Sequence, residues 1–203
     1  MNWKEFNALL VLATAMCFTP GPNTTLSTAL AANHGLRRAM PFICAVPLGW
    51  GVLLGVCALG LGALVLAVPL LSWAIKLVGV AYLLWLALKI ARSRQLGQAD
   101  AARLNVTFWQ GAALQFVNIK AWMLALAIVS GWIAGRADPG QRFAVVLPVM
   151  LAFAFASNLS YALAGSLLRD WLGGPEGSGK RLHRFNRVMA AVLVATAIWM
   201  LFI

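Results

Sequence analysis

The sequence predicts an all-α integral membrane protein with six transmembrane helices. Its 203 residues are 62% hydrophobic and only 10% charged, which leaves too little polar surface to cover a water-soluble core of this size. Apolar segments of about 17 to 25 residues recur along the chain, a length that suits helices crossing a hydrocarbon layer about 30 Å thick. No stretch remains for a soluble domain, so we expect one transmembrane domain over residues 1–203.

The apolar segments divide the chain into two halves. The predicted spans cover residues 6–32, 39–68, 70–91, 108–134, 143–168 and 187–203. A turn at Val68, Pro69 and Leu70 predicts a tight hairpin between the second and third spans. The sixth span is short and begins at Arg187, so a partly interfacial helix is an alternative there. The longest connection, 92–107, is predicted as a cytoplasmic linker between a first half at 1–91 and a second half at 108–203.

The basic residues predict the orientation of these spans. Four of them, Lys4, Lys76, Arg136 and Arg142, lie on one side of the membrane. The connections on the other side hold Arg37, Arg38, Lys89, Arg92, Arg94, Arg103, Arg169, Lys180, Arg181, Arg184 and Arg187. The positive-inside rule places this larger set in the cytoplasm and both termini outside, and it explains the net charge of +11 better than nucleic-acid binding does. Three spans per half then insert in opposite orientations, which predicts a 3+3 inverted repeat, an architecture of transporters.

The stretch FTPGPNTT at 18–25 interrupts the first span near the membrane midplane. Its two prolines remove two backbone donors and its glycine adds flexibility, so the helix is predicted to break there. Asn23, Thr24 and Thr25 supply side chains that could cap a new helix, whose first amides would attract a carboxylate. The candidate substrate-binding residues of this stretch are Pro20, Gly21, Pro22, Asn23, Thr24 and Thr25.

A second polar group, Gln115, Asn118 and Lys120, lies near the middle of the fourth span. A lysine at this depth is costly and nearly always faces the bundle interior, so Lys120 is predicted to bind substrate. The alternative is that it donates to backbone carbonyls that the broken first span frees. Desolvation favours the neutral amine, which makes Lys120 a candidate for proton coupling as well.

The fifth span carries Asn158 and Tyr161, whose neutral oxygens could hold an ammonium group. Hydrogen bonding between helices is an equally good interpretation of these side chains. None of the five acidic residues lies deep within a span, which argues against a substrate with a cationic side chain. No cofactor or metal is predicted, and no ATP site either, because Arg181 stands where a phosphate-binding loop requires Ser or Thr. Ion or substrate gradients should therefore drive any transport.

Four motifs together resemble the LysE family of bacterial amino-acid exporters: TPGPN at 19–23, LSTALAANHGLRRAM at 26–40, GVAYLLWLALKIARS at 79–93 and QFVNIKAW at 115–122. The resemblance implies secondary active, proton-coupled export of small neutral amino acids or their derivatives across the bacterial inner membrane, without enzymatic activity. QFVN-Ile-Lys and LALKIA resemble the cysteine and O-acetylserine exporter branch, although threonine-like or homoserine-like substrates fit too. Many family members have proline where this chain has Ile119, which leaves open whether the fourth helix is broken.

A transmembrane thiol/disulfide electron carrier is the alternative from another functional class, because Cys17 directly precedes the first break. All three cysteines, Cys17, Cys44 and Cys57, lie in the first half, whereas a symmetric carrier would need one in each half. The predicted partners are an amino-acid substrate, protons and the lipid bilayer. A homodimer is one candidate assembly, and the sequence does not distinguish it from a monomer.

Overall fold

A computed structural model describes residues 1–93, 106–174 and 179–202, and every regular element in these segments is a helix. The all-α prediction is thereby confirmed. The predicted linker at 92–107 lies mostly outside the described residues. In chain order the helices are α1 (Trp3–Phe18), α2 (Pro22–His34), α3 (Leu36–Ala58), α4 (Leu61–Ala67), α5 (Pro69–Arg92), α6 (Phe108–Val117), α7 (Ile119–Ile128), the π-helical η2 (Val129–Ile133), α8 (Pro139–Leu167), α9 (Arg169–Gly173) and α10 (Lys180–Leu201).

Four of these helices, α3, α5, α8 and α10, are long and apolar enough to cross a membrane. The pair formed by α6 and the α7–η2 segment gives a fifth candidate span, which is bent by 69°. The first predicted span is divided into α1, with 16 residues, and α2, with 13, and neither half is long enough to cross alone. The described residues therefore support a multi-pass membrane protein with four or five candidate spans.

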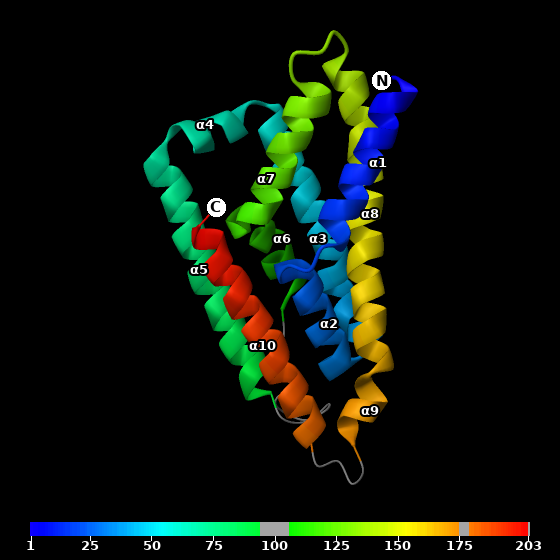
Figure 1. Cartoon of the computed structure of the whole chain (residues 1–203), viewed down its shortest axis with the longest axis vertical. Coiled ribbons are helices and arrows are strands. Elements are labelled where there is room, and N and C mark those ends of the chain that lie inside the picture. Colours follow the sequence, from blue (N-terminus) through cyan, green and yellow to red (C-terminus); the bar gives the residue numbers. More distant parts are fainter. Residues whose placement is uncertain (94–105, 175–178, 203) are drawn as a thin grey trace.

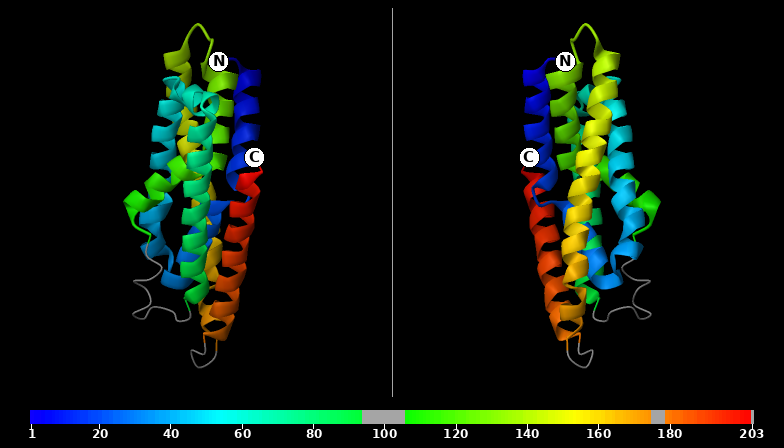
Figure 2. Two further views of the ribbon diagram at one scale, coloured as in Figure 1. Left: turned by 90° about the vertical axis from the view of Figure 1, so that its left-hand side faces the viewer. Right: turned by 90° about the vertical axis from the view of Figure 1, so that its right-hand side faces the viewer.

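The helices form one elongated bundle (Figure 1). α1 descends from the N-terminus to the middle of the bundle and α2 continues to its lower end, while α6 and α7 together rise in the opposite direction. The turn from α2 to α3, the end of α5 and the start of α10 lie at the lower end, and the side views show the same arrangement (Figure 2). The helix ends that carry basic residues assigned to the cytoplasm thus gather at one end, as far as the described residues extend.

Two predicted boundaries were wrong. The second predicted span, 39–68, is not one helix, because α3 ends at Ala58 and Gly60 takes a left-handed conformation (φ 90°) that only glycine adopts readily. α4 then crosses the end of the bundle before Pro69 starts α5, so no tight hairpin joins the two spans (Figure 1). The sixth helix begins at Lys180 and not at residue 187, which makes it a full-length candidate span of 22 residues.

Glycines allow the closest helix contacts. A methyl group on Gly165 of α8 would lie 2.3 Å from the carbonyl oxygen of Thr28 in α2. A methyl group on Gly79 of α5 would lie 2.0 Å from the carbonyl oxygen of Val117, at the end of α6. Small residues permit this approach of backbones in membrane helix bundles, and here they hold both broken segments against long helices.

We predict that Gly165→Ala destabilises the protein by about 1–3 kcal/mol, because the new methyl group overpacks against backbone that cannot move aside cheaply. Gly140→Ala is the matched control in the same helix, since nothing lies within 4 Å of a methyl group at that position. Thermal unfolding of the purified variants in detergent measures both effects. Equal unfolding midpoints for the two variants would contradict the close α2–α8 contact.

Candidate functional site

The first helix break is arranged around Gly21. α1 ends at Phe18, Thr19 is extended, and α2 begins at Pro22, which as the first helical residue needs no backbone donor. The sequence predicted caps from residues 23–25, but Gly21 is the N-cap residue. The Thr24 hydroxyl accepts a hydrogen bond from the Gly21 amide (3.0 Å) and donates one to the Gly21 carbonyl (3.1 Å). Only Thr24 of the three therefore supports the cap.

Side chains from two other helices satisfy the carbonyl groups that the break frees at the end of α1. Ser157 Oγ of α8 donates to the Cys17 carbonyl at 2.6 Å, and Tyr161 OH of α8 donates to the Phe18 carbonyl at 2.9 Å. Lys120 Nζ of α7 donates to the Thr19 carbonyl at 2.9 Å. Three consecutive carbonyls that a helix end leaves unpaired are thus each paired within the bundle.

The second break lies at Asn118, which is extended (φ −93°, ψ 101°) between α6 and α7. The helix is broken although Ile119 stands where the resembled family has proline, so the open question is answered by the structure. Its causes lie in other helices and in aromatic side chains. Gly79 makes room for the Val117 carbonyl, and the indole of Trp122 donates to the Phe116 carbonyl at 2.8 Å.

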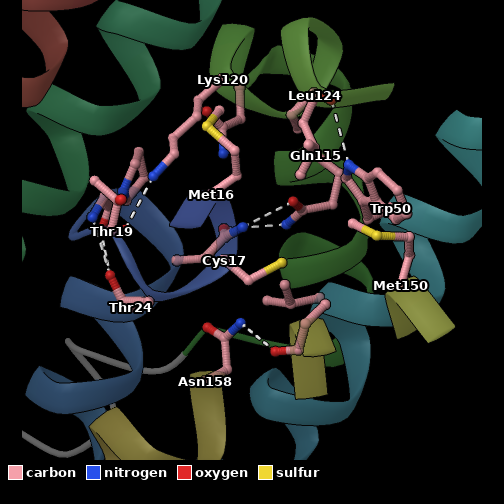
Figure 3. Close-up of a pocket in the computed structure, with 17 residues that line it drawn as sticks. Met16, Cys17, Thr19, Thr24, Trp50, Gln115, Lys120, Leu124, Met150 and Asn158 are labelled. Atoms are coloured by element: carbon pink, nitrogen blue, oxygen red, sulfur yellow. Dashed lines mark hydrogen bonds between the residues drawn. The ribbon is translucent and has the colours of Figure 1, made fainter. Parts of the chain in front are cut away.

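The two breaks face each other across a cavity of about 70 Å³ (Figure 3). Eight of the predicted site residues line this cavity: Gly21, Pro22, Asn23, Thr24, Gln115, Asn118, Lys120 and Asn158. Pro20 does not line it and lies instead, with Thr19 and Lys120, in a separate groove beside α10. Thr25 and Tyr161 are not among the lining residues either, and Tyr161 holds the end of α1 as described above.

The other lining residues were missed by sequence reasoning because most are apolar and none breaks a pattern. They are Met16, Cys17, Thr19, Val46, Trp50, Ala121, Leu124, Met150 and Ala154. Figure 3 shows Met16, Cys17 and Met150 on the same cavity as Lys120 and Gln115. Only the position of Met16 and Cys17 directly before the break could have indicated them.

Most amide groups of the cavity have partners within the bundle, but Asn118 Oδ1 is buried with no hydrogen-bond partner among the described residues. Asn23 and Gln115 exchange two hydrogen bonds, at 2.9 and 3.1 Å, which join α2 to α6. Asn158 accepts from Ser27 at 2.9 Å and so joins α8 to α2. These bonds fix the cavity walls and leave Asn118 Oδ1 as an acceptor available to a ligand.

Lys120 is the only charged side chain among the lining residues. A methyl group on Gly21 would lie 3.4 Å from its Nζ atom, so a glycine there leaves the ammonium room beside the start of α2. The first amides of α2 add partial positive charge. Within the described segments no three His, Cys, Asp or Glu side chains cluster in a way that could hold a metal ion. The cavity is therefore suited to a small ligand with an anionic group.

The three cysteines are free thiols, two of them half-buried and Cys57 buried. Cys17 faces the cavity, whereas Cys44 and Cys57 do not line it. No pairing among them supports a thiol/disulfide carrier in the described part of the chain.

Comparison with known proteins identifies the chain's relatives. The family model of the LysE type translocator matches residues 14–202. The cysteine/O-acetylserine efflux proteins of Escherichia coli (strain K12) and Shigella flexneri are each 34% identical over 192 residues, covering 92% of this chain and 91% of theirs. The protein of that name from E. coli O139:H28 is 33% identical over the same length. No solved structure matches the chain. The predicted resemblance is confirmed, and the chain belongs to the LysE family of translocators.

Proposed function

We propose that this protein is a secondary active exporter of small neutral amino acids or their derivatives. The observation that carries the proposal is one lysine ammonium placed beside the start of α2, in a cavity that lies between two helix breaks. Half-helix N-termini that point at anionic substrate groups are a recurring feature of secondary transporters. The relatives are named cysteine/O-acetylserine efflux proteins. Their name supports transport out of the cell and a small neutral amino acid as the substrate.

The lining residues support a small, uncharged substrate side chain. The cavity is small, it has no acidic lining residue to pair with a cationic side chain, and three sulfur-containing side chains contribute to its wall: Met16, Cys17 and Met150. Thioether and thiol groups are polarizable and pack against varied small groups. We therefore favour cysteine-like or O-acetylserine-like substrates over threonine-like or homoserine-like ones.

Lys120 can hold the substrate carboxylate without leaving α1. An ammonium group has three donors, and the described residues account for one of them, in the bond to the Thr19 carbonyl. The remaining donors and the first amides of α2 would bind the carboxylate. The two roles predicted for Lys120, substrate binding and pairing with a freed carbonyl, are thus compatible. We further propose that this amine is the proton-coupling group.

The proposed topology has six passes in two inverted halves. α1 with α2 and α6 with α7 each count as one pass, beside α3, α5, α8 and α10. The courses of these helices in Figure 1 and the gathering of basic residues at the lower end support this proposal, with the lower end in the cytoplasm and both termini outside. Both a monomer and a homodimer are compatible with it.

We predict that Lys120→Met abolishes export while the protein still inserts into membranes. Truncating one partner of a desolvated charge pair costs about 2–5 kcal/mol, so the apparent affinity should fall at least about 30-fold. Counterflow of labelled L-cysteine and L-serine in proteoliposomes measures this loss.

Tyr161→Phe is the matched control for Lys120→Met. It removes one donor to the neighbouring Phe18 carbonyl but no charge from the cavity. Export within about fivefold of the parent is expected, because one neutral hydrogen bond contributes about 1 kcal/mol. Equal loss in both variants would mean that Lys120 serves only to hold α1.

We also predict that the double variant Pro20→Ala, Pro22→Ala transports at least about tenfold more slowly. Restoring two backbone N–H groups removes a penalty of about 3 kcal/mol per proline against a continuous helix, so the break should partly heal. Pro148→Ala, in the continuous helix α8, is the control. Transport at the parent rate in the double variant would contradict a role for the broken helix.

A further inference from the structure

α1 is packed much more loosely than the half-helix that follows it. Only Leu9 and Ala13 are buried among its 16 residues, whereas ten of the 13 residues of α2 are buried. Val11 and Trp3 are 70% and 74% exposed. In Figure 1 α1 lies at the edge of the bundle beside α8. Segments with few buried contacts are those that move most readily within a native structure.

Polar contacts hold α1 at both of its ends. At its inner end the three carbonyls of residues 17–19 accept from Ser157, Tyr161 and Lys120. At its outer end the carboxylate of Glu5 lies 3.4 Å from Arg136 and 3.3 Å from Arg142. The inner contacts belong to the site described above, but nothing so far accounts for the outer ones.

The outer ionic cluster consists of Glu5, Arg136, Asp138 and Arg142. Arg142 also donates to Asp138 at 2.7 Å, and that hydrogen bond lowers the pKa of the Asp138 carboxyl below its usual value. The indole of Trp132 donates to the Glu5 carbonyl at 2.8 Å. Besides the arginines, the Glu5 carboxylate accepts from the Asn2 amide within its own helix start. The cluster therefore joins α1 to the η2 segment and to the start of α8.

These elements are the same ones that carry the cavity. α1 continues from Glu5 to the lining residues Met16 and Cys17, and the α7–η2 segment continues back from Trp132 to Lys120. One short helical segment on each side therefore connects the outer cluster directly to the cavity. Partly exposed ion pairs are individually weak, so the cluster can open without unfolding the packed core.

We propose that the outer ionic cluster is the outer gate of the transporter: it holds α1 over the cavity, and its opening lets α1 move away and exposes the cavity to the side opposite the basic loops. The proposal rests on the export function and orientation proposed above. It assigns Glu5 and Arg142 a positioning role, since neither lines the cavity.

Cys17 provides a direct readout of the gate. It is half-buried, it lines the cavity, and it becomes the only thiol when Cys44 and Cys57 are replaced by alanine. In this background, reaction of Cys17 with a charged, membrane-impermeant methanethiosulfonate reagent measures access from each face of oriented vesicles. The measurement needs no substrate and no transport.

We expect Glu5→Gln and Arg142→Gln each to raise the rate of Cys17 labelling from the outer face by about threefold to fivefold, the effect of removing a partly exposed ion pair. Lys4→Gln, which removes a charge at the exposed neighbouring position, should label at the parent rate. Raising the salt from about 50 mM to about 500 mM should also speed labelling of the parent, because salt screens exposed charges.

Unchanged Cys17 labelling in both glutamine variants would overturn the gate proposal. An equal increase in Lys4→Gln, or faster labelling only from the side of the basic loops, would overturn it as well. If a glutamine variant fails to insert, the salt dependence of the parent decides in its place, and a rate independent of salt would overturn the gate. Loss of export in Lys120→Met tests the binding site separately, because that variant leaves the outer cluster intact.

Discussion

The need to pair every backbone polar group inside a membrane governs this structure. A helix that breaks at mid-bundle leaves carbonyls at one end and amides at the next start, where no water is at hand to bind them. Here three donors from α7 and α8 take up the carbonyls of residues 17–19. The residues that begin α2 line a cavity, so in the proposed binding mode the first amides of this helix are available to an anion.

The same demand explains why glycine and tryptophan occur around the second break. The Val117 carbonyl is accommodated because Gly79 has no side chain, and the indoles of Trp122 and Trp50 donate to the Phe116 and Ala121 carbonyls. Proline is one way to break a helix, by removing a donor. Here one freed carbonyl is paired by an indole of α7 and another is given room by a glycine of α5, so the break forms without proline.

These causes decide what could be predicted from the sequence. The first break follows from Pro20 and Pro22, and the depth of Lys120 from the cost of a charge in an apolar segment, since both are local properties of the chain. The second break and the crossing helix α4 depend on tertiary contacts. The early start of α10 depends on basic side chains at a helix end, and a hydropathy pattern does not reveal a helix there. The apolar cavity wall was missed for the same reason, because nothing local separates Met150 or Trp50 from ordinary core residues.

In the proposed binding mode, Lys120 connects the binding of a ligand to the position of α1. Its ammonium donates to a carbonyl at the end of α1 and faces the cavity as well, so the two contacts share one charge. A ligand shifts a conformational equilibrium only by the difference in its affinity for the two states. The Thr19 carbonyl and a bound carboxylate would both lie against the same ammonium. The Thr19 carbonyl moves with α1, because it lies at the end of that helix. If the carboxylate binds as proposed, a movement of α1 that breaks the contact with Thr19 changes the affinity for the carboxylate, and substrate binding then favours one position of this half-helix over another.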